Sequence, residues 1–400
     1  MKILVINAGS SSLKYQLIDM DGEKVLAKGI CERLGGEDGT FTHKAFGQKW
    51  EYAVPMHNHT EAFEEVKKAL TEGEGKVIDD LSEVDAIGHR VVQGGDRFDR
   101  SVIVTDKVKK DIDELAELAP LHNKGALQGI EAATALFGTD IPQVVTFDTA
   151  FHQTMEQKVY MFALPYEYYE KYHVRRYGAH GTSHRYVSGR CCELLGRTEG
   201  TRIITCHLGS GSSISAIKDG KIMDTSMGLT PLDGFMMGTR TGGFDPSAVT
   251  YIMDREHLTP KEMDQIMNKK SGTLGISGKY SDDRDIEAAI ERGDERAKLA
   301  WDMRTYQIVK FVGGYIAALG GLDALVFTAG IGENQPRVRA EVIEALSFLG
   351  MKCDYEANKV HGKETLITTP DSAIPAWVIP TDEEMVIARD TMALALELKK

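Results

Sequence analysis

The pattern of apolar and polar positions divides the chain into short strands and amphipathic helices. Near the N-terminus, in ILVINAGSSSLKYQ, the apolar run Ile3–Ile6 predicts a buried strand that stops at Asn7. The small residues that follow predict a turn, and Leu13–Ile18 predicts a second strand. Small residues let backbone N–H groups approach an anion, and Lys14 adds a positive charge. The hairpin can therefore hold a phosphate, with a plain glycine/serine turn and a surface lysine as the alternative.

The same pattern returns about half a chain later. Residues 203–216, IITCHLGSGSSISA, again predict an apolar strand, a glycine/serine turn and a strand, and an Asp-Gly turn follows each copy. A repeat at this distance predicts two similar domains and not a solenoid, whose repeats span roughly 20–50 residues. Two such hairpins facing each other would hold one polyphosphate from both sides, which favours the phosphate interpretation.

Strands and helices alternate along the rest of the chain. We expect strands over 86–92, 143–147 and 325–328, and helices over 60–70, 108–118, 122–137 and 294–319, after Pro336 and after Thr381. The alternation from residue 86 onward predicts parallel pairing. A capping box of Thr381 and Glu384 is expected to begin the last helix. No low-complexity linker is present, so we place the boundary near Ala150, between domains 1–150 and 151–383, with helix 384–400 packing back on the first.

Composition narrows the class of protein. The net charge of −13 argues against nonspecific nucleic-acid binding, so local arginines and lysines would have to attract an anionic substrate. No apolar run approaches the roughly 20 residues of a membrane span, and the start has no signal-peptide pattern. The 5 cysteines form no CxxC pair, which indicates a reducing cytoplasm without disulfides or structural zinc.

Polar residues stand where predicted strands end. Asn7, Asp148, His207 and the segment 330–334 all follow strands, and ligands of α/β sheets bind at these carboxyl ends. At the segment 330–334, N–H groups and the dipole of the following helix would favour phosphate.

Three basic residues lie close to glycines. Arg90, His180 and Arg240 have little bulk around them and can reach a ligand. Phosphoryl transfer needs such cations to neutralise the charge of the moving group. For each arginine the alternative is a structural salt bridge, and for His180 it is a hydrogen-bonded loop histidine.

Longer motifs resemble the acetokinase family of acetate kinases over essentially the full length. They are VINAGSSSLK (5–14), GHRVV (88–92), PLHN (120–123), FDTAFH (147–152), RRYGAHGTSH (175–184), DTSMGLTPLDGFMMGTRTG (224–242), FTAGIGEN (327–334) and TDEE (381–384). The resemblance implies the duplicated actin-like α/β fold of the sugar kinase, Hsp70 and actin superfamily, with an interdomain cleft. It also implies a cytoplasmic homodimer that transfers a phosphoryl group reversibly between ATP and acetate, giving ADP and acetyl phosphate, with Mg²⁺ or alternatively Mn²⁺.

The resemblance also implies which residues form the site. Most of the residues that contact the nucleotide would lie in the second domain. Asn7 and Glu383 would hold the metal. Arg90 would bind acetate, with Val92, Leu121 and Pro231 around its methyl group. The catalytic residues would be Asp148, His180 and Arg240. The nucleotide would contact Ser10, Ser12, Lys14, His207, Leu208, Gly209, Ser210, Gly211, Asp282, Asp283, Arg284, Gly330, Ile331, Gly332, Glu333 and Asn334.

Four residues depart from the pattern usual in the family: Gln93, Lys124, Ser210 and Gly243. Two other activities stay open. One is a propionate or butyrate kinase of the same family. The other is an actin-like or Hsp70-like protein that uses ATP to drive binding to a partner, which would need a further binding segment.

Overall fold

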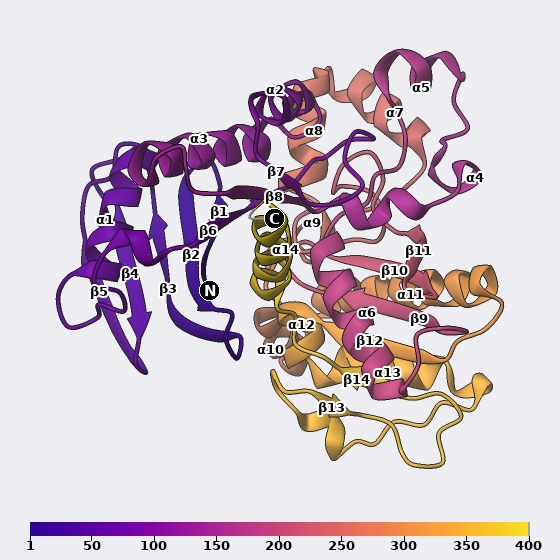
Figure 1. Cartoon of the computed structure of the whole chain (residues 1–400). Helices are drawn as coiled ribbons and strands as arrows, with labels where there is room; N and C mark the ends of the chain where they lie inside the picture. The colour runs from indigo at the N-terminus through magenta and orange to yellow at the C-terminus, as the bar shows by residue number, and fades with distance from the viewer. Residues whose placement is uncertain (399–400) are drawn as a thin grey trace. The chain divides into compact units, whose positions relative to one another are not determined.

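The computed structural model describes residues 1–398 and divides the chain into two compact units. Unit 1 comprises Met1–Gln153 and the chain from Asp382 onward, and unit 2 comprises Thr154–Thr381. The colours in Figure 1 run along the chain, so the yellow helix α14 is seen to return to the indigo strands of unit 1.

Unit 1 is built on one eight-stranded mixed sheet with the strand order β5-β4-β3-β2-β1-β6-β8-β7. Its strands are β1 Lys2–Ala8, β2 Ser12–Asp19, β3 Lys24–Glu32, β4 Thr40–Ala45, β5 Gln48–Ala53, β6 Ala86–Val91, β7 Val102–Ile103 and β8 Gln143–Phe147. Its helices are α1 His59–Thr71, α2 Asp106–Glu114, α3 Pro120–Phe137 and α14 Glu383–Glu397, with 3₁₀ turns at Leu81–Glu83 and Leu115–Glu117.

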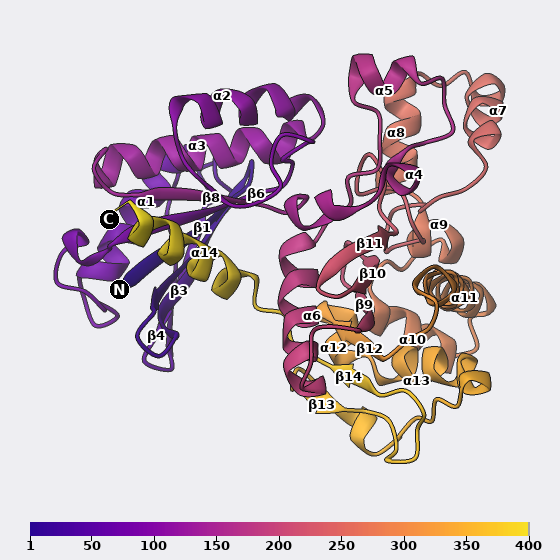
Figure 2. The same cartoon turned by 45° about the vertical axis from the view of Figure 1, so that its right-hand side comes forward.

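The alternation of side chains along β1 decides which helix covers which face of this sheet. Leu4 and Ile6 face the core shared with α1 and α3, whereas Ile3 and Val5 face α14. A side chain on Gly88 of β6 would meet Thr391 Oγ1 of α14 at 2.4 Å, so glycine lets this helix approach the sheet closely. Figure 2 shows α14 lying along the sheet opposite α3.

Unit 2 has a six-stranded sheet with the order β11-β10-β9-β12-β14-β13. Its strands are β9 Arg202–His207, β10 Ser213–Lys218, β11 Lys221–Thr225, β12 Ala324–Thr328, β13 Thr365–Leu366 and β14 Ala376–Val378. Its helices are α4 Gln157–Tyr160, α5 Glu167–Tyr172, α6 Gly181–Leu195, α7 Pro246–Glu256, α8 Pro260–Lys269, α9 Gly272–Ser277, α10 Asp283–Glu291, α11 Glu295–Leu319, α12 Ala329–Asn334 and α13 Pro336–Ala345. Short 3₁₀ turns lie at Ser347–Leu349 and Ala357–Lys359, and the turn Ala150–Thr154 spans the chain position where unit 1 gives way to unit 2.

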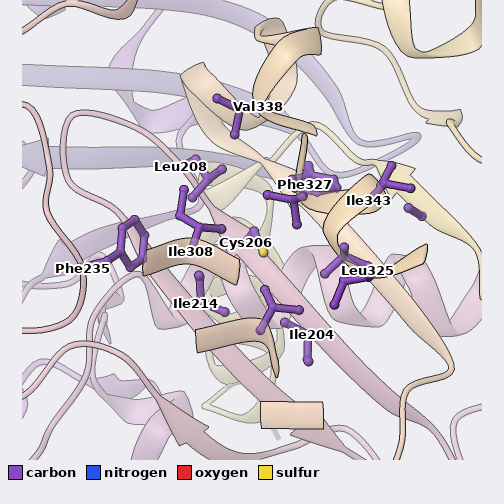
Figure 3. Close-up of a cluster of buried hydrophobic side chains, with 14 of the residues drawn as sticks. Ile204, Cys206, Leu208, Ile214, Phe235, Ile308, Leu325, Phe327, Val338 and Ile343 are labelled. Carbon is purple, nitrogen blue, oxygen red and sulfur yellow. The ribbon is translucent and has the colours of Figure 1, made fainter. Parts of the chain in front are cut away.

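One face of the unit 2 sheet is apolar and the other carries polar groups. Ile204 and Cys206 of β9 pack with Ile308 of α11 and Val338 of α13 in the core shown in Figure 3. The intervening Thr205 is also fully buried, but on the opposite face, where its hydroxyl meets α6. This polar face is the one that brings histidines together.

The two units repeat one strand arrangement. The orders β3-β2-β1-β6-β8 and β11-β10-β9-β12-β14 correspond strand for strand, each with two antiparallel hairpin pairings followed by two parallel pairings. The predicted hairpins and the predicted parallel pairing are therefore confirmed. Among residues 1–398, no helix is long and apolar enough to cross a membrane.

Two local predictions are wrong. The last helix is not capped by Thr381 and Glu384, because the side chain of Asp382 accepts from Met385 N–H while the Thr381 hydroxyl bonds to Ser183. The segment 330–334, which we expect to lie between a strand and a following helix, belongs instead to the short helix α12, whose first residue Ala329 has φ +65°.

Candidate functional site

In unit 1 the predicted phosphate hairpin is a rigid turn. Asn7 and Lys14 are direct partners across β1 and β2, so the amide and the ammonium stem from opposite positions of the ladder. Gly9 N–H donates to the Ser12 carbonyl at 2.8 Å, and His59 Nε2 lies 2.9 Å from the Gly9 carbonyl. A side chain on Gly125 of α3 would come within 2.6 Å of the Gly9 backbone, so glycine lets this helix support the turn.

Arg90 and Asp148 form an ion pair at the ends of β6 and β8. Arg90 Nε donates to Asp148 Oδ1 at 3.1 Å, and Nη2 donates to Oδ2 at 2.5 Å. Asp148 is 2% exposed and Arg90 is 23% exposed. The coulombic attraction of Asp148 raises the pKa of Arg90, so the guanidinium stays charged. The salt-bridge alternative considered for Arg90 is thus present, although a guanidinium has five N–H donors and can bind a second anion.

Glu383, the first residue of α14, completes this group. Its carboxylate lies 3.8 Å from Arg90 Nε. The pKa of Glu383 is raised to about 7, mainly by burial; Arg90 opposes this shift, whereas the nearby carboxylates of Asp148 and Glu384 add to it. A cavity of about 10 Å³, the space of roughly one water-sized sphere, is lined by Asn7, Lys14, Arg90, Glu383 and Glu384.

The donor set of this cavity fits one hard divalent cation. Among residues 1–398 no cluster of three or more His, Cys, Asp or Glu could hold a metal ion by itself. Mg²⁺ does not need such a cage, because it keeps several waters and binds through one or two carboxylates together with phosphates. Glu383, Glu384 and the Asn7 amide supply oxygen donors of this kind, and a cation bound here would offset the burial that is the main cause of the raised pKa of Glu383.

In unit 2 the second hairpin is pinned to α12 through Leu208. Its N–H donates to the Thr328 carbonyl, and its carbonyl accepts from the N–H groups of Ile331 at 2.7 Å and Gly332 at 3.1 Å. The Ala329 N–H is taken by Glu333 Oε1 at 2.8 Å. These three N–H groups are therefore not available to a phosphate. The N–H groups of Ile331 and Gly332 do not form the anion site predicted for the segment 330–334.

Around Gly211, the same hairpin brings two predicted catalytic groups together. A side chain on Gly211 would meet Arg240 Nη1 and His180 Nε2, both at 3.4 Å. His180 has φ +59°, a left-handed conformation that costs roughly 1–2 kcal/mol in a residue other than glycine. Strain of this kind concentrates at functional sites.

Arg240 is a half-buried cation. Its Nη1 donates to the Pro231 carbonyl at 3.0 Å, and among the described residues no carboxylate lies within ion-pair distance of it. Burial lowers the pKa of Arg240 below its usual value. An anion bound here would supply the counter-charge that the protein does not.

His207 stacks on His180 with ring centroids 4.1 Å apart, and its Nδ1 lies 2.8 Å from Ser183 Oγ. The other turn residues differ in exposure: Ser210 is exposed, whereas Gly209 is half-buried. The Ser212 hydroxyl donates to the Gly209 carbonyl at 2.8 Å and accepts from its N–H at 3.1 Å. The turn is thus held by its own side chains.

The segment 282–284 contributes mainly to local structure. Asp282 caps α10 and accepts from Arg284, which is 87% exposed. Asp283 is buried and its carboxylate pairs with Arg304 at 2.7 Å. Asp283 therefore has its charge neutralised inside the protein, and we assign it to holding α10 and not to contacting a nucleotide.

The remaining predicted residues lie at the edges of these two groups. Ser10 is exposed, Ser12, Val92 and Pro231 are half-buried, and Gly330 and Asn334 are exposed on α12. Leu121 belongs to α3, but its side chain lies outside the described part of the chain. The sequence interpretation did not single out Ser213 and His184, although alternation along β10 places Ser213 on the polar face.

These features define an actin-like phosphotransferase: the sheet core occurs twice, and each hairpin turn lies near basic groups suited to phosphate, Lys14 in unit 1 and Arg240 with His180 in unit 2. Comparison with known proteins identifies the family. A model of the acetokinase family matches residues 2–389. An acetate kinase of Thermoanaerobacterium thermosaccharolyticum is 52% identical over 401 residues, covering 100% of both chains.

Solved structures give the same result. An acetate kinase of Porphyromonas gingivalis has a TM-score of 0.94 at 48% identity, covering 98% of this chain and 99% of its own. A propionate kinase of Francisella tularensis has a TM-score of 0.91 at 41% identity, with the same coverage. The chain belongs to the acetokinase family and has its duplicated actin-like α/β fold.

Proposed function

We propose that this chain catalyses reversible phosphoryl transfer between ATP and acetate by direct in-line attack, giving ADP and acetyl phosphate. Family membership and the acetate kinase relatives support this activity. Acetate is already ionised at neutral pH, so the reaction needs no strong general base. What it needs is positioning and neutralisation of the phosphoryl oxygens.

The acceptor and the metal are assigned to groups of unit 1. Arg90 binds the carboxylate of acetate with donors not used by Asp148, and Asp148 in turn fixes the guanidinium plane. Val92, Leu121 and Pro231 are assigned to the methyl group by the family resemblance. Asn7 and Glu383 would hold Mg²⁺ through oxygen atoms and water, with Mn²⁺ as an alternative, and the ion would neutralise phosphate charge.

The nucleotide and the transferring phosphoryl group are assigned mainly to unit 2. Arg240 and His180 Nε2, which flank Gly211, stabilise the equatorial oxygens as charge develops. Lys14 and the hydroxyls of Ser10 and Ser12 contact phosphate from unit 1. The turn 207–211 and the exposed surface of α12 contact the nucleotide.

The half-buried Arg240, with its pKa lowered and no carboxylate partner among the described residues, carries this proposal. Arg240→Ala should lower kcat on the order of 10²–10³-fold while ATP still binds, because the contact strengthens only in the transition state. Arg240→Lys should recover part of the rate, since a point charge cannot replace the planar fork. Arg255→Ala, at an exposed arginine of α7 outside the proposed site, serves as the matched control.

A coupled assay of acetate-dependent ADP formation tests the activity. An Arg240→Ala enzyme within a fewfold of the wild-type kcat would make Arg240 structural. ADP formation that does not depend on acetate would favour an ATP-driven binding protein. The similarity to a propionate kinase supports one second candidate, propionate as acceptor, so formate, acetate, propionate and butyrate should be compared in the same assay.

We also propose that the enzyme is a cytoplasmic homodimer, as the family resemblance implies. Sedimentation equilibrium of the full chain tests the dimer directly.

A further inference from the structure

A buried series of polar side chains runs behind His180 in unit 2. Ser213 Oγ lies 2.8 Å from His180 Nδ1 and 2.7 Å from His184 Nε2. His184 Nδ1 lies 2.6 Å from Thr205 Oγ1. Ser213, His184 and Thr205 are 0% exposed. Side chains from β9, β10 and α6 thus form one hydrogen-bonded series that includes His180.

One hydroxyl proton links the two histidines. A serine hydroxyl has a single proton, so Ser213 can donate to one histidine and must accept from the other. If Ser213 donates to His180 Nδ1, the ring proton of neutral His180 is on Nε2, and His184 Nε2 donates to Ser213. If Ser213 donates to His184 instead, His180 Nε2 loses its proton and becomes an acceptor. The Ala179 carbonyl, 3.4 Å from Ser213 Oγ, is a longer and weaker alternative partner.

The two arrangements differ at the atom that faces the proposed phosphoryl group. His180 Nε2 lies beside Gly211 and Arg240 Nη1. Only a protonated Nε2 can donate a hydrogen bond to a phosphoryl oxygen that gains negative charge. The partner of one imidazole nitrogen generally decides which nitrogen carries the proton.

We propose that Ser213, oriented by His184, is a positioning residue for phosphoryl transfer: its hydroxyl donates to His180 Nδ1 and keeps Nε2 as a donor. The inference rests on the proposed role of His180. Ser213 does not touch the substrate, and it acts only through the imidazole.

A neighbouring serine provides a matched control for a purely structural role. Ser215 lies two residues further along β10, on the same face, and is also 0% exposed. Its hydroxyl bonds to Thr225 Oγ1 at 2.9 Å and not to a histidine. Ser215→Ala therefore removes a buried hydroxyl from the same strand without altering the series behind His180.

The first test is kinetic. Ser213→Ala should lower kcat roughly 10–100-fold, the range found when partners that orient a metal-bound histidine are removed. Its KM values for ATP and acetate should stay within about twofold, since ground-state binding is untouched. Ser213→Thr retains the hydroxyl and should recover most of the rate, and Ser215→Ala should leave kcat unchanged. A Ser213→Ala enzyme with wild-type kcat, or an equal loss in Ser215→Ala, overturns the proposal.

The second test separates this inference from the role of His180 itself. In a His180→Ala background, Ser213→Ala should cause no further loss of kcat, because its effect passes through the missing imidazole. An additional loss of about tenfold would overturn the positioning role alone. A His180→Ala enzyme with wild-type kcat would instead remove the proposed role of His180, and this inference with it.

The third test needs no activity. ¹⁵N NMR of the full chain with labelled histidine reports which imidazole nitrogen carries the proton. In wild type, His180 should show a protonated Nε2 and an unprotonated Nδ1, and Ser213→Ala should shift both resonances. A wild-type spectrum with Nδ1 protonated, or a His180 spectrum unchanged in Ser213→Ala, contradicts the proposal.

Discussion

Arg90 and Asp148 face each other through two parallel hydrogen bonds, although 58 residues separate them in sequence. The pair stands at the adjacent ends of the parallel strands β6 and β8. Paired in this way, the guanidinium cannot rotate freely, so its remaining donors present a fixed edge to a second anion. Under the proposed function, this edge of Arg90 is the part of unit 1 that binds the carboxylate of acetate.

The different burial of the two partners predicts different costs when each is removed. Arg90→Ala removes the guanidinium that pairs with the 2% exposed Asp148 carboxylate, whereas Asp148→Ala leaves a 23% exposed cation. We expect Arg90→Ala to destabilise unit 1 by about 3–5 kcal/mol, the usual cost of stranding a buried charge, and Asp148→Ala to cost less. Thermal melts of both variants at neutral pH measure this order. The reverse order would show that Asp148 is solvated once Arg90 is absent.

Gly211→Ala should impair catalysis without unfolding the chain. The new methyl group would lie 3.4 Å from both Arg240 Nη1 and His180 Nε2, at the limit of ordinary van der Waals contact, and would occupy the space beside both groups where we place the phosphoryl group. Displacements at a reacting centre are costly, and we expect kcat to fall roughly 10–100-fold. Gly189→Ala on the exposed side of α6 meets nothing within 4 Å and is the control. An unchanged kcat in Gly211→Ala would place the phosphoryl group elsewhere.

Val92→Ala tests the assignment of the acyl pocket. Val92 lies two residues beyond Arg90 and is half-buried. If it borders the methyl group of acetate, removing two methyl groups should lower KM for propionate more than for acetate. Apolar pockets discriminate one methylene by about 1–3 kcal/mol, so wild type should prefer acetate by roughly 10–200-fold in kcat/KM. An unchanged preference combined with a lower Tm would make Val92 a packing residue only.

His89 predicts a dependence of stability on pH. Burial lowers the pKa of His89 to about 4, and its Nε2 lies 2.8 Å from Gln143 Oε1. The unfolded histidine has a pKa of about 6.5, so between pH 6.5 and pH 4 the unfolded state binds more protons, and stability falls as pH falls. His89 alone should cost roughly 2 kcal/mol at pH 5 relative to pH 7.5.

Chemical denaturation at these two pH values measures the loss. In His89→Gln the difference between them should shrink, whatever the absolute stability of the variant. His361→Gln changes an exposed histidine and should keep the wild-type difference. If the stability of His89→Gln differed between the two pH values as much as that of wild type, groups other than His89 would cause the acid sensitivity.

The sequence by itself determined the repeated hairpins and the parallel core. Alternation of apolar residues and the turn chemistry of Asp-Gly are local signals: at Asp219-Gly220 both residues have positive φ, as the predicted two-residue turn requires. These signals depend on neighbours within a few positions, so they can be read without knowledge of the fold. The long family motifs predicted a specific activity, which the local pattern alone could not do.

The tertiary structure decided which polar groups form hydrogen bonds or ion pairs within the protein. The Thr381 hydroxyl bonds to Ser183, 198 residues away, so Asp382 caps the last helix. The Leu208 carbonyl accepts from the N–H groups of Ile331 and Gly332 in α12, and the Asp283 carboxylate pairs with Arg304. A polar side chain satisfies its hydrogen bonds with whatever the fold brings near, and buried groups leave few of them unmade. Partners that lie tens or hundreds of residues apart leave no periodic trace in the sequence, so only the folded chain reveals them.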